Sequence, residues 1–350
     1  MPALDVGTEA IDRFLLSLLD GAERFAAANQ PQRFELRAGP LDLTLDVAGA
    51  LYARRLTAAF AAPGTGRSPG VRVIALDGAA TGLGAPGAWH FPVTQRGHLE
   101  RLHEQPALGL TARFDPDTRT WRVLSLPRRL AVVWTADAAA LPEWEDAAPL
   151  RDIIHWASAP EPWLLVHAAC VGAGGRGALL AGAGGSGKST TTAACVLAGM
   201  QTTGDDFVLT DPGGGAAHAL YDTIKLGPDS LDMLPGWAGA IANPGRDADQ
   251  KARIHLRRAR PDSLAPTLKL DALLLPTISG APRTAIAPAP PGEAVRALVP
   301  STAFLLRGGA AASIRKAGAL ARALPAFRLS LGRDPAEAAA FIAAFLRGFA

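Results

Sequence analysis

The 350-residue sequence contains very little cysteine and very little lysine. Its two cysteines, Cys170 and Cys195, could form at most one disulfide bond, so the chain lacks the disulfide framework of small secreted domains. We therefore expect a reducing, cytoplasmic environment. Lysine occurs five times against thirty arginines, and the first 187 residues contain none. In such a chain, a lysine can mark a position that needs a compact, flexible ammonium group.

Other absences exclude whole classes of protein. The net charge is only +3, which over this length gives no indication of a nucleic-acid partner. The amino-terminal segment MPALDVGTEAIDRFLL carries acidic residues where a secretory signal peptide needs basic ones. The chain also lacks an uncharged apolar run of about 18 residues, so we expect no membrane span. With 49% hydrophobic and 19% charged residues, it can bury a large core.

The hydropathy pattern predicts two domains of an α/β protein. Residues 9–28 have helical spacing, and short alternating segments such as LDLTLDV and VRVIALD then predict a mostly β domain over residues 1–148. From residue 149 the pattern changes, and we predict a catalytic domain over 149–350. Its predicted elements include the continuous strand LLVHAACVG, a loop over 235–250, the strand KARIHL, and a last helix that Asp334 caps.

One motif in the second domain is specific. Residues 182–189, GAGGSGKS, match the phosphate-binding P-loop pattern G-x-x-x-x-G-K-[ST] between an apolar strand and a helix-forming run. Its glycines allow backbone N–H groups to surround an anion, Lys188 would contact the β- and γ-phosphates of ATP, and Ser189 would bind Mg²⁺. The predicted nucleotide-binding residues of this loop are Gly182, Gly184, Gly185, Ser186, Gly187, Lys188, Ser189 and Thr190.

Two adjacent carboxylates follow the P-loop helix. Asp205 and Asp206 are the only acids well placed to act with the loop, because the later strand DALLLPTI ends in Pro276 and Thr277, without an acid. The guanine-reading motif Asn-Lys-x-Asp is also absent, which argues against a GTPase. One carboxylate could hold Mg²⁺ while the other accepts the proton of an attacking hydroxyl. The alternative is a solvated Gly-Asp-Asp turn.

Two further groups are weaker candidates. His167 lies in the apolar segment before the P-loop strand, where it is either a core histidine or a partner of the carboxylates. Strand periodicity in KARIHLRRAR places Lys251, Arg253, His255 and Arg257 on one face. That face is either solvated or a cationic wall for the nucleotide or an acidic acceptor, and Lys225 is a weaker member of the same group.

The segments HAACVG, GALLAGAGGSGKSTTTA and GDD together resemble the catalytic domain of HPr kinase/phosphorylase. The resemblance covers about residues 165–210 and implies the phosphoenolpyruvate-carboxykinase-like α/β fold. It also implies that Asp205 is the general base, Asp206 a metal-side ligand and His167 a partner of the base, and it suggests a homo-oligomer. The segment LYDTIKLG replaces the Glu-x-Arg-Gly signature of true HPr kinases, so the closer likeness is to related serine kinases of bacterial biosynthetic clusters, some of which phosphorylate a precursor peptide.

Three functions are compatible with these features. The first is an ATP- and Mg²⁺-dependent phosphotransferase with an alcohol group as acceptor, a serine kinase that acts on a Ser or Thr hydroxyl of a peptide or small protein. The second is a small-molecule alcohol kinase with the same site. The third is a nucleotide-binding regulator without transferase activity, against which the carboxylate pair argues, because a regulator needs no base.

Overall fold

The computed structural model describes residues 8–64, 70–86 and 101–348, and its fold is mixed α/β, as predicted. The chain divides into two compact units. Unit 1 comprises most of the chain up to Ala157, and unit 2 comprises Ser158 onward together with the short segments Ala38–Pro40 and Ala59–Ala62. The predicted domain boundary at residue 148 lies nine residues earlier than this division, just before the helix Arg151–Ser158.

Unit 1 is built on a mixed β-sheet. Among the described residues, eight strands follow the order β3-β1-β2-β4-β8-β7-β6-β5. The pairs β2–β4 and β4–β8 are parallel, whereas β5 to β8 form an antiparallel meander. The strands are β1 (Gln32–Ala38), β2 (Leu41–Ala48), β3 (Ala62–Pro63), β4 (Val71–Asp77), β5 (Arg101–Gln105), β6 (Leu110–Asp115), β7 (Thr120–Ser125) and β8 (Leu130–Thr135).

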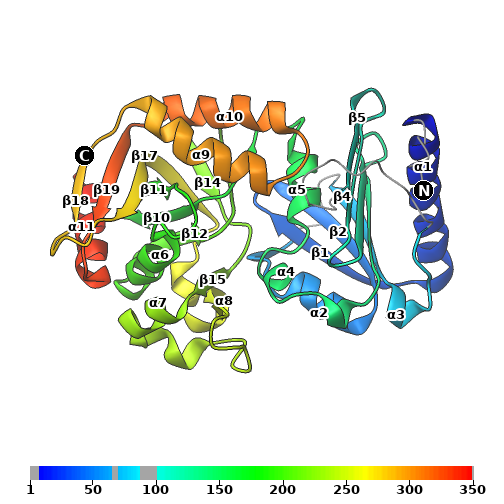
Figure 1. The fold of residues 1–350 in the computed structure, drawn as a ribbon, viewed down its shortest axis with the longest axis horizontal. Helices are drawn as coiled ribbons and strands as arrows, with labels where there is room; N and C mark the ends of the chain where they lie inside the picture. Colours follow the sequence, from blue (N-terminus) through cyan, green and yellow to red (C-terminus); the bar gives the residue numbers. More distant parts are fainter. Residues whose placement is uncertain (1–7, 65–69, 87–100, 349–350) are drawn as a thin grey trace, which may run out of the picture. The chain divides into compact units, whose positions relative to one another are not determined.

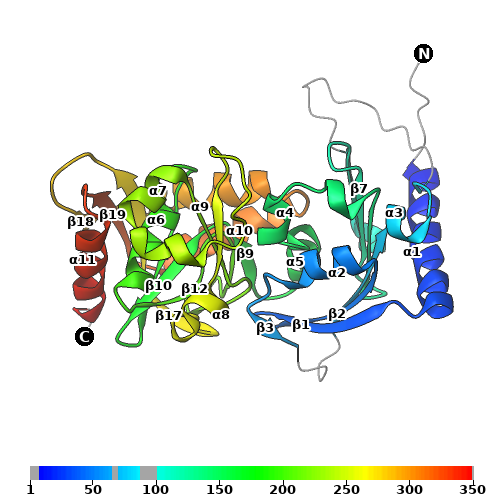
Figure 2. The same ribbon diagram turned by 90° about the horizontal axis from the view of Figure 1, so that it is seen from below.

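The long helix α1 (Thr8–Asn29) covers one face of this sheet (Figure 2). Its buried residues Ile11, Leu15 and Leu19 recur at helical spacing and pack on Trp121 and Trp134 of the meander. The prediction of a helix over 9–28 is therefore confirmed. The remaining helices of the unit are α2 (Ala50–Thr57), α3 (Gly78–Thr81), η1 (Pro106–Leu108), η2 (Ala138–Ala140), α4 (Trp144–Ala147) and α5 (Arg151–Ser158).

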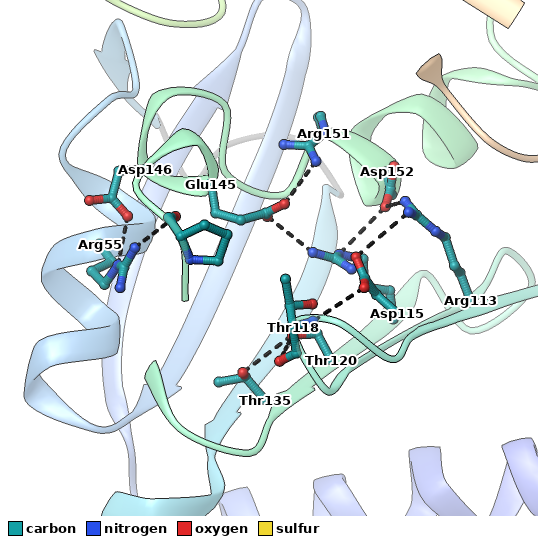
Figure 3. A network of polar contacts seen from close by, with 12 residues as sticks. Arg55, Arg113, Asp115, Thr118, Thr120, Thr135, Glu145, Asp146, Arg151 and Asp152 are labelled. Atoms are coloured by element: carbon teal, nitrogen blue, oxygen red, sulfur yellow. Dashed lines mark hydrogen bonds and ion pairs between the residues drawn. The ribbon is translucent and has the colours of Figure 1, made fainter. Parts of the chain in front are cut away.

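A network of buried charges joins the meander to α4 and α5 (Figure 3). Because side chains alternate along a strand, Arg122 points away from the α1 face that its neighbours Trp121 and Val123 occupy. Its guanidinium contacts Glu145 of α4 at 3.0 Å and Asp152 of α5 at 3.5 Å. Arg113 of β6 contacts the same Asp152 oxygen at 2.8 Å. Each buried charge in this network therefore has an opposite charge beside it, which is the condition for burying it at moderate cost.

Unit 2 is built on a second mixed sheet. Nine described strands belong to it, with the central order β12-β10-β11-β17-β14-β13-β9, while β19 pairs with β17 and β18. They are β9 (Leu164–Val166), β10 (Ala169–Ala173), β11 (Arg176–Leu180), β12 (Gln201–Gly204), β13 (Val208–Thr210), β14 (Ala216–His218), β17 (Thr267–Ile278), β18 (Ala285–Pro288) and β19 (Ala326–Leu331). A separate hairpin joins β15 (Thr223–Leu226) to β16 (Ala252–His255).

Helices cover both faces of this sheet (Figure 1). On one face, α6 (Lys188–Leu197) and α11 (Pro335–Arg347) share a core with the β15–β16 hairpin. On the other face, α9 (Pro291–Leu305) and α10 (Ala310–Ala323) pack with Leu298 and Leu320. The short helices are α7 (Pro228–Met233), η3 (Pro235–Ala240), α8 (Leu256–Ala259) and η4 (Pro261–Ser263). The predicted cap of the last helix is confirmed, because Asp334 accepts a hydrogen bond from the backbone of Ala336 at 2.9 Å.

Both cysteines are buried in unit 2, on opposite faces of its sheet. Cys170 of β10 belongs to the core beneath α9 and α10, and Cys195 of α6 belongs to the core on the other face. Burial raises the pKa of each thiol to about 12.

The predicted loop over 235–250 is wrong for its first part. Residues Pro235–Ala240 form the 3₁₀-helix η3, and Trp237 at its centre is completely buried. The glycines and prolines of the segment suggested an irregular loop, but the apolar area of one indole is enough to fix this turn to the core.

Among residues 8–64, 70–86 and 101–348, no helix has both the length and the apolar composition that crossing a bilayer requires.

The charge network yields a stability prediction for unit 1. Burial opposes ionisation of Asp152, but Arg113 and Arg122 outweigh it and lower the pKa of this carboxyl. Asp152→Asn removes the shared anion and leaves two buried guanidinium groups with too little negative charge. We expect a loss of about 3 kcal/mol or more in the free energy of unfolding from urea denaturation.

Asp20→Asn is the matched control. Asp20 pairs with Arg128 at 2.8 Å on the surface of the same unit, with about half of the Asp20 side chain exposed. Its loss should cost about 0.5 kcal/mol or less. Equal effects of the two substitutions would show that the buried network contributes no more than a surface pair.

Candidate active site

Strand register brings three chain segments to one end of the unit 2 sheet. β10 pairs antiparallel with both β11 and β12, so its first residues lie beside the last residues of the other two. Ala169 is opposite Leu180, and Cys170 is opposite Gly204. The P-loop follows β11, the Asp205–Asp206 pair follows β12, and His167 precedes β10. Residues separated by up to 39 positions in the sequence therefore meet at this end.

The P-loop has the backbone that its glycines make possible. Gly185 and Gly187 have φ angles of 80° and 97°, a region that residues with a Cβ rarely adopt. Gly187 is directly followed by α6, whose first turn presents free N–H groups and a partial positive charge. The Lys188 ammonium is buried and donates to the carbonyl oxygens of Gly182 at 2.7 Å and Ala183 at 3.1 Å. The loop thus combines an anion-binding helix start with a cation at its centre.

A β-bulge aims the carboxylate pair at the P-loop. The pairing of β10 with β12 shifts register at Thr203, so that two residues of β12 occupy one position of the ladder. Gly204 then turns with a φ of 145°, and the hydroxyl of Thr202 fixes the turn by accepting from the Gly204 N–H at 3.0 Å and donating to the Cys170 carbonyl at 2.6 Å. Asp205 is consequently directed into the protein at the start of α6 instead of into solvent.

Asp205 is the buried member of the pair. Its side chain accepts from the backbone N–H of Lys225 at 3.4 Å, and its Oδ1 atom has no hydrogen-bond partner of normal geometry among the described residues. Burial and the adjacent negative charge of Asp206 raise the pKa of Asp205 to about 7, and the nearby Ser189 hydroxyl and Lys225 oppose that rise. A carboxyl group with this pKa can accept a proton efficiently near neutral pH.

Asp206 is the ionised member. Its carboxylate forms an ion pair with the Lys225 ammonium and lies 3.9 Å from Nε2 of His167. Although burial works against ionisation, His167 and Lys225 outweigh it and lower the pKa of Asp206. The two carboxyl groups therefore differ sharply: one holds a charge beside the Lys225 ammonium and the His167 ring, and the other titrates near neutrality.

His167 lies beside the carboxylates, but the predicted continuous strand around it is wrong. The chain leaves the sheet at His167 and Ala168, between β9, which pairs with β13, and β10, which pairs with β11. One apolar segment thus contributes to two strand pairs that lie towards opposite ends of the strand order, which hydropathy alone cannot reveal. The imidazole packs against Phe207 with ring centroids 5.2 Å apart, and its Nδ1 has no partner within the described part of the chain.

The predicted basic face is assembled only in part. β16 ends at His255, so Arg257 lies on α8 and binds Asp222 at 3.1 Å; its assignment to the strand was wrong. Arg253 pairs in register with Lys225. Lys251 is exposed, and its charge contributes to lowering the pKa of Lys188, an effect that is due mainly to burial. Thr190, predicted to bind nucleotide, has its hydroxyl 2.7 Å from that of Ser230 in α7.

Lys225 has a larger part in the site than its prediction as a weaker member of the basic group. Its ammonium contacts Asp206 and its backbone contacts Asp205, so it organises both carboxylates. The available signal was its rarity, because it is one of only five lysines and it follows the Asp pair closely.

The donor atoms suit Mg²⁺ only together with phosphate oxygens. The Ser189 hydroxyl, the Asp206 carboxylate and the unpartnered Oδ1 of Asp205 are the hard oxygen donors that this ion prefers. The described residues contain no group of three or more His, Cys, Asp or Glu side chains that could hold a metal by themselves. A magnesium ion bound through one or two carboxylates and the phosphates of a nucleotide fits this set.

A scan of the sequence against protein-family models gives no match, and a search of curated proteins gives none either.

The raised pKa of Asp205 yields a pH prediction for the protein without nucleotide or Mg²⁺. Its pKa is about 7 in the folded state and about 4 in the unfolded state, so the folded protein binds one more proton between these values. Stability from this group is therefore present at pH 4 and is lost as the pH rises towards 7. Relative to Asp205→Asn, the wild-type free energy of unfolding should fall by on the order of 1 kcal/mol per pH unit across this window.

Urea denaturation of both proteins at about pH 5, 6 and 7, within this window, and at about pH 8, above it, measures the difference in the free energy of unfolding. The difference should level off above pH 7. A difference that stays constant from pH 5 would show that Asp205 is ionised throughout.

Proposed function

We propose that this protein is an ATP- and Mg²⁺-dependent kinase that transfers the γ-phosphate to a hydroxyl group, most specifically a Ser or Thr hydroxyl of a peptide or small protein. The observation that carries the proposal is the position of a buried carboxyl group with a pKa of about 7 at the same sheet end as a complete P-loop. A protein that only binds nucleotide has no use for a titrating carboxylate there, whereas a kinase needs a proton acceptor.

In the proposed reaction, the acceptor oxygen attacks the γ-phosphorus while the bond from that phosphorus to the ADP oxygen breaks. The hydroxyl proton passes to the carboxylate of Asp205. The N–H groups at the start of α6 and the Lys188 ammonium stabilise the negative charge on the phosphate oxygens. Bound magnesium would neutralise part of that charge, with Ser189 and Asp206 as its protein ligands.

His167 and Lys225 have supporting roles in this proposal. Both lie beside Asp206 and keep it ionised, which in turn raises the pKa of Asp205 through the charge of its neighbour. The base and its negatively charged neighbour are therefore one electrostatic unit. The resemblance to HPr kinase/phosphorylase implies the same roles for the two aspartates, but it makes His167 a partner of the base, whereas His167 lies beside Asp206.

The proposed peptide acceptor has two supports. The resemblance extends to serine kinases that act on precursor peptides. Among the described residues, the sheet of unit 1 ends in the strands β3 and β5, whose edges could accept an extended peptide by strand addition. The proposed location is the cytoplasm, where ATP and magnesium are plentiful.

The proposal predicts transfer of one phosphate to a Ser-containing peptide. We expect incubation with Mg·ATP and peptides encoded by neighbouring genes to give a product heavier by one phosphate in mass spectrometry. Lys188→Ala should reduce the rate by roughly 10²-fold or more, because the lost charge contacts the transferring group. Turnover on a small alcohol instead of any peptide would change the acceptor class, and near-normal turnover in Lys188→Ala would exclude the P-loop from the reaction.

Substitution of each carboxylate should have a different effect on the reaction. Asp205→Asn should retain Mg·ATP binding in calorimetry but lose transfer, because an amide cannot accept the hydroxyl proton. Asp206→Asn should instead weaken the dependence of nucleotide binding on Mg²⁺. If Asp205→Asn alone abolishes nucleotide binding, the two roles are reversed.

A further inference from the structure

A cavity of about 400 Å³ lies between η3 and α8, outside the site described above. Its wall consists of the glycine-rich turn around Trp237 on one side and His255, Arg258 and Arg260 on the other. We call it the η3–α8 cavity. Its volume is in the range of pockets that hold small metabolites.

Arginine side chains give the wall of the η3–α8 cavity a positive charge, and Asp222 lies behind this wall, where it contacts His255. None of its lining residues is an Asp or Glu. Within the described residues, Arg258 forms no ion pair, and the Arg260 guanidinium lies 6.0 Å from the centre of the Trp237 ring without a carboxylate partner. Arg257, which lies on α8 and precedes both of them, behaves differently because Asp222 neutralises it at 3.1 Å. Arg258 and Arg260 therefore line the cavity without a carboxylate partner among the described residues.

His255 is held in a fixed orientation at this wall. Its Nδ1 lies 2.9 Å from Oδ1 of Asp222, and that carboxylate is 1% exposed. An ionised carboxylate accepts hydrogen bonds, so the Nδ1 atom carries a proton, and Nε2 on the other side of the ring can donate to an anion only when it is protonated as well. This is the kind of second contact that fixes a ligand-binding imidazole.

Trp237 gives the wall of the cavity a donor without a partner. The residue is completely buried, yet its indole Nε1–H has no hydrogen-bond partner among the described residues. Leaving a buried donor unpaired costs about 1–3 kcal/mol, and native proteins seldom accept this without a reason. Because Trp237 is one of the residues that line the cavity, an anion oxygen that reached this edge of the ring would satisfy the donor.

The cavity is separate from the P-loop. Gly236, in its wall, packs against Leu197, the last residue of α6; a Cβ at Gly236 would lie 3.1 Å from the Leu197 side chain. The P-loop lies at the other end of this ten-residue helix, about 15 Å away along its axis. A single small anion cannot occupy both positions.

We propose that the η3–α8 cavity is a second anion site, which binds a small phosphate-bearing molecule. Arg258 and Arg260 can each offer two parallel N–H donors to phosphate oxygens, and the His255 ring and the Trp237 indole complete the wall. The proposal does not depend on kinase activity, because it concerns binding at a place distant from the reacting groups.

Calorimetry with pyrophosphate tests the proposal in a Lys188→Ala background, which weakens binding at the P-loop. The Lys188→Ala protein, which is the parent of the variants below, should bind one pyrophosphate. Arg258→Glu with Arg260→Glu should weaken that binding at least about 10-fold, because two charge-assisted contacts become repulsive. The matched control, Arg315→Glu with Arg322→Glu, makes the same change in net charge at exposed positions on α10 and should leave the affinity unchanged.

Two further measurements complete the test. Trp237→Phe keeps the buried ring but removes the N–H, and should weaken binding several-fold while the melting temperature stays close to that of the parent. Citrate replaces pyrophosphate in a parallel titration and should bind more weakly if the site selects phosphate. The proposal is overturned if pyrophosphate does not bind in the Lys188→Ala background, if the α8 and control variants bind equally, or if citrate binds more tightly.

Discussion

The cost of burying two adjacent carboxylates governs the unit 2 site. Two like charges a few ångströms apart in a poorly hydrated place cannot both be stable without compensation. The fold meets this cost in two ways: Asp206 stays charged beside Lys225 and His167, while Asp205 holds its proton up to about pH 7. Several nearby elements position the pair or compensate its charge. The bulge at Thr203 and the turn at Gly204 direct the pair inward, and the β15–β16 hairpin supplies the necessary ammonium.

Unit 1 buries charge by a different rule. There Arg113, Arg122 and Arg151 are matched by Asp152 and Glu145, and each guanidinium lies within about hydrogen-bonding distance of a carboxylate. The guanidinium groups lower the pKa of both carboxyl groups, so Asp152 and Glu145 stay ionised. The network is therefore suitable for holding α4 and α5 on the sheet and unsuitable for proton transfer. In unit 2 the compensation of negative charge is incomplete: Asp205 has too little positive charge beside it to stay ionised, and it keeps its proton up to about pH 7. That incompleteness distinguishes a group that can take part in chemistry from one that only stabilises the fold.

The sequence was most informative where the chemistry is local. The P-loop and the Asp pair lie within 25 residues, and their glycines report directly on the backbone that they require. His167, Lys225 and Arg257 could be located less well, because their positions depend on where strands end, and neighbouring hydropathy does not mark those ends. The rarity of lysine helped to locate site residues, but it did not distinguish them from a lysine with a structural role. Lys188 and Lys225 lie at the site, whereas the Lys316 ammonium is surrounded by the carbonyl oxygens of Ser158, Ala159, Glu161 and Trp163 at 2.7–3.0 Å and has a structural role.

Because of where the two cysteines lie, alkylation of their thiols can measure local unfolding of unit 2. A thiol with a pKa of about 12 inside a packed core is almost entirely unreactive, so alkylating reagents modify it only when the surrounding structure separates. Cys170 lies under the α9–α10 layer and Cys195 in the α6 layer. The two labelling rates would therefore give the opening free energy of each helical layer separately, without an engineered probe. Because the sequence has no other cysteine, unit 1 would remain silent in that experiment.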